Sequence, residues 1–193
     1  SALVILVKRL PDRLGAADPD STLSNLALLV DGTTPIVLDH GGFLSHVRGD
    51  EITVYFGESP ELQRPQVNSL QATHAAMEIR DFVDRWNRER ADKGLPALEV
   101  GMGIATGEVV VGTLDTRRGS QPAVVGDVVH TANHIAEITQ AIHGNNLLIS
   151  EETYRYLASA QQHFEFGRYG KTVLQGSNRE VMVYEIRDRM IRL

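Results

Sequence analysis

Two histidines are spaced so that they could act together. His130 and His134 are four residues apart in a segment of helical periodicity, so they share one face of the predicted helix. Zinc-binding histidine pairs use this spacing. The His-Glu-x-x-His context of zinc proteases is absent, because Thr131 follows His130. One interpretation of the pair is a histidine-rich metal site. The other is that the two histidines bind nothing and occupy positions without a function.

The carboxylate of Asp50 lies where two predicted strands turn. Asp50 follows Gly49 between strands predicted over Phe43–Val47 and Ile52–Phe56. A carboxylate at such a tip could bind a divalent cation, and an aspartate is also common in a hairpin turn for its own sake. Both interpretations of Asp50 remain open.

The elements around these residues centre on the segment from 98 to 142. Alternating apolar residues over 98–104 predict a half-buried strand, and 109–111 begins a second one. The short apolar pair Val124-Val125 comes next. Val128, Ala132 and Ile135 then fall on one face of a helix, with Asp127 placed as its N-cap.

The rest of the chain alternates strands and helices. The apolar run at 3–7 predicts a central strand, and a helix from about residue 23 is interrupted by the Asp-Gly-Thr-Thr-Pro segment 31–35. Further elements are a long amphipathic helix over 67–86, a strand over 147–149, a helix capped by Ser150, and closing strands over 164–186. This order predicts an α/β sandwich around a mixed sheet.

Composition limits the classes of function. With 193 residues and 42% apolar content, we expect one domain with a full core. A net charge of -6 without a basic stripe disfavours nucleic acid as a partner. No run is long and apolar enough to span a bilayer, and there is no cysteine. We expect a single cytoplasmic domain, 1–193, excised from a larger protein.

Several segments together resemble the catalytic domain of class III nucleotidyl cyclases, the adenylate and guanylate cyclases. They read GIATGEVVVG over 103–112, VVGDVVHTANH over 124–134 and LLISEETY over 147–154. Gly49-Asp50 and the ending VMVYEI over 181–186 agree as well. The resemblance implies the fold of that family, a ferredoxin-like βαββαβ core with extra strands and helices, classed as α/β (α+β).

The resemblance also implies a chemistry. Members of the family join the ribose 3′-oxygen to the α-phosphate and expel pyrophosphate, using two divalent ions held by a pair of aspartates. Two composite sites form across a head-to-tail dimer. One subunit supplies the metal-binding aspartates, and the other supplies the groups that read the purine and stabilise the transition state.

The metal half of the site departs from the family pattern. The first metal-binding aspartate aligns with Lys8, whereas the second is retained as Asp50. A divalent ion about 4 Å from an ammonium is repelled by roughly 8 kcal/mol at an effective dielectric near 20. We therefore expect no ordinary two-metal site, and Mg²⁺ or Mn²⁺ as a cofactor only if the domain is active.

The nucleotide half departs as well. By the resemblance, the purine-reading lysine and its partner become His46 and Ala123, the ribose-orienting asparagine becomes His130, and the transition-state arginine becomes His134. The late Lys-Gly-Lys motif appears as residues 175–177, Gln-Gly-Ser. Loss of a comparable arginine from phosphoryl-transfer enzymes costs on the order of 10³-fold or more in rate.

By the resemblance, the residues that build the scaffold are thus retained, whereas most residues that touch nucleotide and metal are replaced. We interpret the chain as a degenerate cyclase homology domain, a pseudo-enzyme that dimerises with itself or with a competent cyclase domain and regulates intracellular signal transduction. The alternatives are an active cyclase that makes cyclic nucleotide from ATP or GTP with a non-standard site, and a domain that senses a nucleotide or another small ligand in the old cleft.

Overall fold

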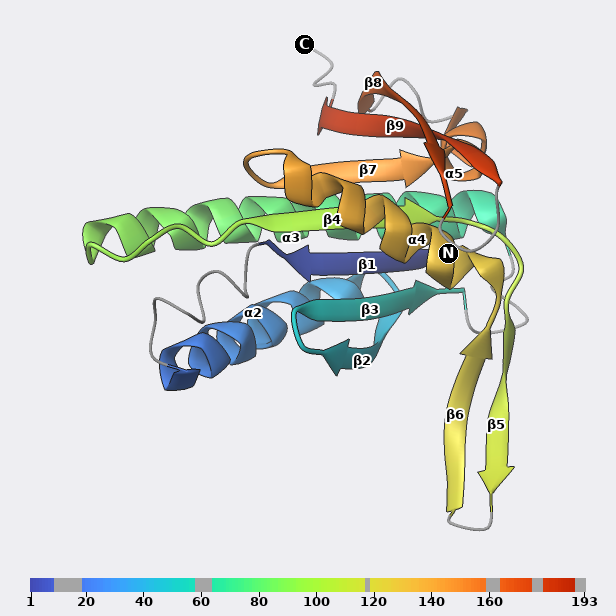
Figure 1. Cartoon of the computed structure of the whole chain (residues 1–193), viewed down its shortest axis with the longest axis horizontal. Coiled ribbons are helices and arrows are strands. Elements are labelled where there is room, and N and C mark those ends of the chain that lie inside the picture. The colour runs from blue at the N-terminus through green and yellow to red at the C-terminus, as the bar shows by residue number, and fades with distance from the viewer. Residues whose placement is uncertain (9–18, 58–63, 117–118, 159–163, 175–178, 190–193) are drawn as a thin grey trace.

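The fold is a mixed α+β arrangement around one seven-stranded sheet (Figure 1). The structure, a computed structural model, describes residues 1–8, 19–57, 64–116, 119–158, 164–174 and 179–189. The strand order is β2-β3-β1-β4-β7-β9-β8, in which β4 and β7 are parallel and the other pairs are antiparallel. This confirms the predicted fold class.

The elements have the following bounds, in chain order. They are β1 (Ala2–Val7), α2 (Pro19–Asp39), β2 (Gly42–Arg48), β3 (Glu51–Phe56), α3 (Pro65–Asp92), β4 (Val100–Ala105), β5 (Val110–Thr116), β6 (Gly119–Val125), α4 (Asp127–Ile138), the 3-10 helix η2 (Thr139–Ala141), β7 (Asn146–Ser150), α5 (Glu151–Tyr156), β8 (Phe164–Val173) and β9 (Glu180–Arg189). Among the described residues, no helix combines the length and apolar character needed to cross a bilayer.

Strand β1 lies at the centre of the protein and separates two cores. All six of its residues are buried. Leu3, Ile5 and Val7 join the larger core, which α2 and α3 cover, whereas Ala2, Val4 and Leu6 join the core beneath α4. The strand is apolar at every position, without polar residues in alternation, because both of its faces are covered.

Helix α2 is continuous, and the predicted interruption at 31–35 is wrong. Gly32 lies against α3, where an added Cβ would be 2.1 Å from Cζ of Phe82. The hydroxyls of Thr33 and Thr34 donate to the main-chain oxygen of Val30 at 3.2 and 2.7 Å, and Pro35 is exposed within the helix. Glycine is thus present for close helix packing, and tertiary contacts override the local tendency to break the helix.

Strands β5 and β6 form a separate two-stranded sheet that projects from the body of the protein (Figure 1). The apolar pair Val124-Val125 forms the end of β6, which extends back to Gly119. Val110 pairs with Val125, and Leu114 lies on the same face four residues further along β5. These three side chains are 72%, 65% and 59% exposed, respectively.

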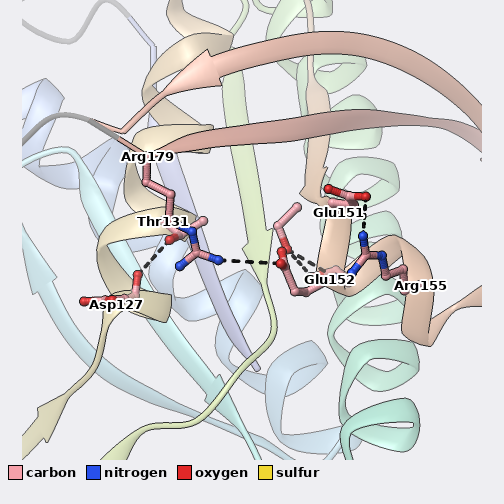
Figure 2. Close-up of polar contacts among 8 residues, drawn as sticks. Asp127, Thr131, Glu151, Glu152, Arg155 and Arg179 are labelled. Carbon is pink, nitrogen blue, oxygen red and sulfur yellow. Dashed lines mark hydrogen bonds and ion pairs between the residues drawn. The ribbon is translucent and has the colours of Figure 1, made fainter. Parts of the chain in front are cut away.

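The predicted starts of α4 and α5 lie at the right places, but the predicted capping residue is correct only for α5. Helix α4 begins at Asp127, so that Gly126 rather than Asp127 is the N-cap, and no side chain caps it. Thr131 donates to the main-chain oxygen of Asp127 at 2.8 Å (Figure 2). At α5 the prediction is confirmed, because Oγ of Ser150 accepts a hydrogen bond from the Thr153 amide.

Candidate active site

Lys8 follows β1 and buries its side chain inside the protein. It is 1% exposed, and its Nζ donates to the main-chain oxygens of Ile142 at 2.8 Å and Gly144 at 2.6 Å. A third hydrogen bond, a short one, joins Nζ to Oδ1 of Asn146. An ammonium group has three N–H donors, so these oxygens match its full donor capacity. All three acceptors lie between η2 and the start of β7.

The path of the Lys8 side chain crosses β4. A Cβ added to Gly101 would lie 3.0 Å from Cε of Lys8 and 1.6 Å from Oγ1 of Thr139. Glycine at 101 therefore leaves the room through which the lysine reaches η2. The same connection is also held by Glu99, whose carboxylate accepts a hydrogen bond from the Gly144 amide at 3.0 Å.

Asp50 lies on the other side of β1. Its main-chain oxygen accepts a hydrogen bond from the Val7 amide at 2.8 Å, which places the β2–β3 turn next to the end of β1. Its carboxylate forms no hydrogen bond or ion pair with the part of the chain that the structure describes. Because β3 and β4 flank β1 on opposite sides, Lys8 directs its amine away from Asp50.

The expected electrostatic picture changes accordingly. An ammonium pointed at the metal position was predicted to repel a cation there. In the structure, the position that aligns with the first metal aspartate has no carboxylate. The amine of Lys8 at this position instead donates hydrogen bonds to main-chain oxygens inside the protein.

His46 lies on β2 within a polar group of its own strand pair. Its Nδ1 is 3.3 Å from Oγ of Ser45, and its Nε2 is 3.7 Å from Oε1 of Glu51. Thr53 donates to the same Glu51 oxygen at 3.0 Å. Burial raises the pKa of the nearby Tyr55 hydroxyl above its ordinary value, and a hydrogen bond with Ser45 opposes that shift.

His134 is directed toward β8, the edge strand opposite β2. Its Nε2 is 3.0 Å from Oγ1 of Thr172, and its side chain is 15% exposed. Its Nδ1 is buried without a hydrogen bond and lies 3.8 Å from Oε2 of Glu137. The residue aligned with the transition-state arginine therefore contacts its own sheet.

The remaining predicted residues are placed separately. His130 is exposed on α4, one helical turn before His134. Ala123 lies on β6 in the projecting sheet, where its backbone pairs with Gly112. Residues 175–177, aligned with the Lys-Gly-Lys motif, lie outside the described residues.

These residues do not fit the metal chemistry that the family uses. Two ions need at least two carboxylates, and only the second, Asp50, is present, because Lys8 occupies the position of the first. Nor do the histidines form a zinc site, because His46 is on one edge strand and His134 contacts the other. Across the described segments, no three His, Cys, Asp or Glu side chains could hold one metal ion together.

Sequence reasoning missed the partners that engage these side chains. Neither Asn146 nor Thr172 belongs to a motif, and both lie far along the chain from the residues they bind. Glu51 could have been noticed, because a second acidic residue directly follows Gly49-Asp50.

The pattern that describes the adenylate and guanylate cyclase catalytic domain matches residues 46–188. The chain belongs to this cyclase family. An adenylate cyclase of Anabaena cylindrica is 32% identical over 152 residues, which are 76% of this chain and 28% of that protein. This cyclase-family chain thus spans less than a third of the length of that relative.

Solved cyclase structures share the fold. The adenylyl cyclase CyaB from P. aeruginosa superimposes with a TM-score of 0.84 at 20% identity, covering 97% of this chain and 92% of that one. A non-canonical dimeric guanylyl cyclase domain of the RhoGC fusion protein from Blastocladiella emersonii has a TM-score of 0.76 at 17% identity. That comparison covers 97% of this chain and 95% of the fungal domain.

Proposed function

We propose that this cyclase-family domain is catalytically degenerate and acts as a dimerising, regulatory module in signal transduction. One observation carries the proposal. At the position aligned with the first metal aspartate, Lys8 is buried with its ammonium bound to three oxygens of the η2–β7 connection. Releasing it toward a nucleotide would leave those oxygens without a donor, so Lys8 serves the fold and not the cleft.

The nucleotide half supports the same proposal. His134 replaces a guanidinium that is always charged with a ring whose Nε2 is engaged by Thr172. Its position close to Glu137 and β8 leaves it poorly placed to receive the charge that develops on a phosphate.

The projecting β5–β6 sheet supports the dimerising role. Its exposed face carries Val110, Leu114 and Val125, which are apolar side chains that a second subunit would remove from water. The partner is a second copy of this domain or another cyclase domain. A competent partner would contribute its own aspartate pair to one of the two composite sites, which makes that pairing the less defective one.

The direct experiment is a cyclase assay on the purified domain. ATP or GTP is supplied with Mn²⁺ or Mg²⁺, and cyclic nucleotide is measured by mass spectrometry. We expect no product above the level of a protein-free control. Robust turnover that disappears in an Asp50→Asn variant would overturn the proposal. Product that is equal in the wild type and in that variant would identify a contaminating cyclase.

One observation favours a second function, an active cyclase with a non-standard site. The carboxylate of Asp50 has no partner among the described residues, and Lys8 is turned away from it. A cation could therefore approach Asp50 if a partner subunit completed its ligands. Mixing the domain with a cyclase domain that lacks its own aspartate pair and retains its transition-state arginine tests this function, because cyclic nucleotide would then depend on Asp50 and would disappear in an Asp50→Asn variant.

A further inference from the structure

A pocket lies on the face of the β8–β9 ribbon that points away from α4. It has a volume of about 500 Å³ and is lined by Glu151, Arg168, Lys171, Glu180, Met182 and Tyr184. Tyr184 packs against the core that α3 covers, whereas its neighbour Val183 packs beneath α4 with Ile135. The pocket is therefore on the opposite side of the sheet from His134 and Asp127, and none of the aligned cyclase residues lines it.

Two of the lining residues, Met182 and Tyr184, contribute apolar surface, and the Tyr184 ring is held in a fixed position. Tyr184 stacks on Tyr154 of α5 with ring centroids 4.1 Å apart and planes 8° apart. Tyr154 in turn meets Phe166 edge to face at 5.1 Å. Because this aromatic cluster holds the Tyr184 ring, that ring and the Met182 side chain present a pre-formed surface for an apolar group.

Both acidic side chains of the lining already have cationic partners. Lys171 donates to Glu180 at 2.8 Å, a bond that lowers the pKa of the Glu180 carboxyl below its ordinary value. Arg155 donates to Glu151 at 2.6 Å, as Figure 2 shows. Next to them, Arg179 lies 3.6 Å from Glu152 (Figure 2). The negative charges of Glu151, Glu152 and Glu180 are therefore each paired with a lysine or an arginine.

Two hydrogen-bond donors of the lining are not engaged. The guanidinium of Arg168 and the hydroxyl of Tyr184 form no hydrogen bond or ion pair within the described part of the chain. Arg168 and Tyr184 are direct cross-strand partners in the β8–β9 register, so their side chains are adjacent on one face. A guanidinium beside a phenol hydroxyl is an arrangement that binds a carboxylate, with two parallel N–H bonds and one O–H bond.

We propose that this pocket binds a small organic monoanion, a carboxylate with an aromatic or other apolar body. The carboxylate would bind Arg168 and the Tyr184 hydroxyl, and the apolar body would cover Met182 and the Tyr184 ring. With the other charges paired, Arg168 supplies one uncompensated positive charge, which matches one negative charge on the ligand. A phosphate dianion would bring a second negative charge that this lining does not match and is disfavoured.

The test uses the ¹⁵N-labelled domain and titrates it with 3-phenylpropionate. Its uncharged analogue 3-phenylpropionamide, acetate and inorganic phosphate are titrated separately. We expect saturable amide shifts confined to the β8–β9 strands and α5, with the amide, acetate and phosphate each binding at least tenfold more weakly. Equal binding of the carboxylate and the amide would overturn the role assigned to Arg168, and shifts centred on α4 and β2 would overturn the location.

Matched variants separate this site from general charge effects. Arg168→Gln should weaken 3-phenylpropionate binding at least tenfold, and Tyr184→Phe, which keeps the ring and removes the hydroxyl, a few-fold. Arg187→Gln makes the same change on β9 outside the pocket and should alter binding less than twofold. Equal losses in Arg168→Gln and Arg187→Gln, or no saturable shift with the carboxylate, would refute the proposal.

This test does not depend on the proposed function, because none of its residues belongs to the aligned cyclase site. Cyclic nucleotide synthesis by the domain would overturn catalytic degeneracy and leave the pocket proposal standing. Thermal midpoints of the three variants, expected to equal that of the wild type, establish that each one folds.

Discussion

Replacing Lys8 by methionine removes the ammonium group while it keeps an unbranched side chain of similar length. The main-chain oxygens of Ile142 and Gly144 and Oδ1 of Asn146 would then lose a donor that is 1% exposed in the wild type. Water has little access to replace it, because the side chain is enclosed by Gly101 and η2. The Lys8→Met variant therefore tests whether this lysine stabilises the fold.

The size of the effect follows from these contacts. A buried polar group left without a partner costs about 1–3 kcal/mol, and the three acceptors of Lys8 are neutral oxygens, so the substitution leaves no buried charge behind. Since the three hydrogen bonds share one donor, we do not add them separately. We expect the free energy of unfolding to fall by about 1–3 kcal/mol. At about 2–4 °C per kcal/mol for a domain of this size, the thermal midpoint should fall by roughly 2–12 °C.

The assay is urea unfolding followed by circular dichroism, with thermal unfolding as a second measurement. Lys93→Met is the matched control, because Lys93 is exposed at the C-cap of α3 and should change stability by less than about 0.5 kcal/mol. If Lys8→Met and Lys93→Met have the same free energy of unfolding, the ammonium is not held inside the protein. In that case Lys8 would be available to the cleft, and the argument for a degenerate site would lose its main support.

Further substitutions test other parts of the structure. Lys8→Asp should be less stable than Lys8→Met in the same urea assay, because its short side chain leaves the three oxygens without a donor and the space beside Gly101 unfilled. Gly103→Ala should destabilise by about 1–3 kcal/mol or prevent folding, since the new Cβ would lie 2.2 Å from the Ala132 main-chain oxygen; an unchanged urea midpoint would contradict the packing of α4 on β4. Leu114→Asp should weaken self-association in analytical ultracentrifugation without a change in thermal midpoint, and an unaltered association constant would exclude this face of β5 from the interface. Ser150→Ala should cost about 1 kcal/mol through loss of the α5 cap, measured by thermal unfolding, whereas Ser150→Thr should recover most of it.

The strands and the α5 cap were predictable because their signals are local. The run at Ala2–Val7 shows its burial on both faces directly in its composition, and Ser150 with the acidic residues after it marks a helix start. Helix α2 was mispredicted because Gly32 and Pro35 have local meanings that packing against Phe82 overrides. Strand β6 was mostly missed, since Gly119–Ala123 lacks the apolar alternation of a buried strand and is held by pairing with β5.

The candidate site divides in the same way. Its substitutions could be located by aligning motifs, because Gly49-Asp50 and the segment 124–134 carry them in the family's order. The destination of each side chain could not be predicted. Lys8 binds residues more than 130 positions away, and His134 bonds to Thr172 across the sheet.

By itself, the amino-acid sequence determined the family, the alternation of strands and helices, and the loss of one carboxylate and one guanidinium from the expected site, since these are matters of residue type and order. Only the tertiary structure decided that the amine of Lys8 is hydrogen-bonded within the fold and that His134 faces the β8 edge. It also decided that Arg168 and Tyr184 are neighbours whose guanidinium and hydroxyl have no hydrogen-bond partner among the described residues. The physical reason is that hydrogen-bond partners and burial depend on which distant segments the sheet brings together, and no local pattern of residues records that pairing.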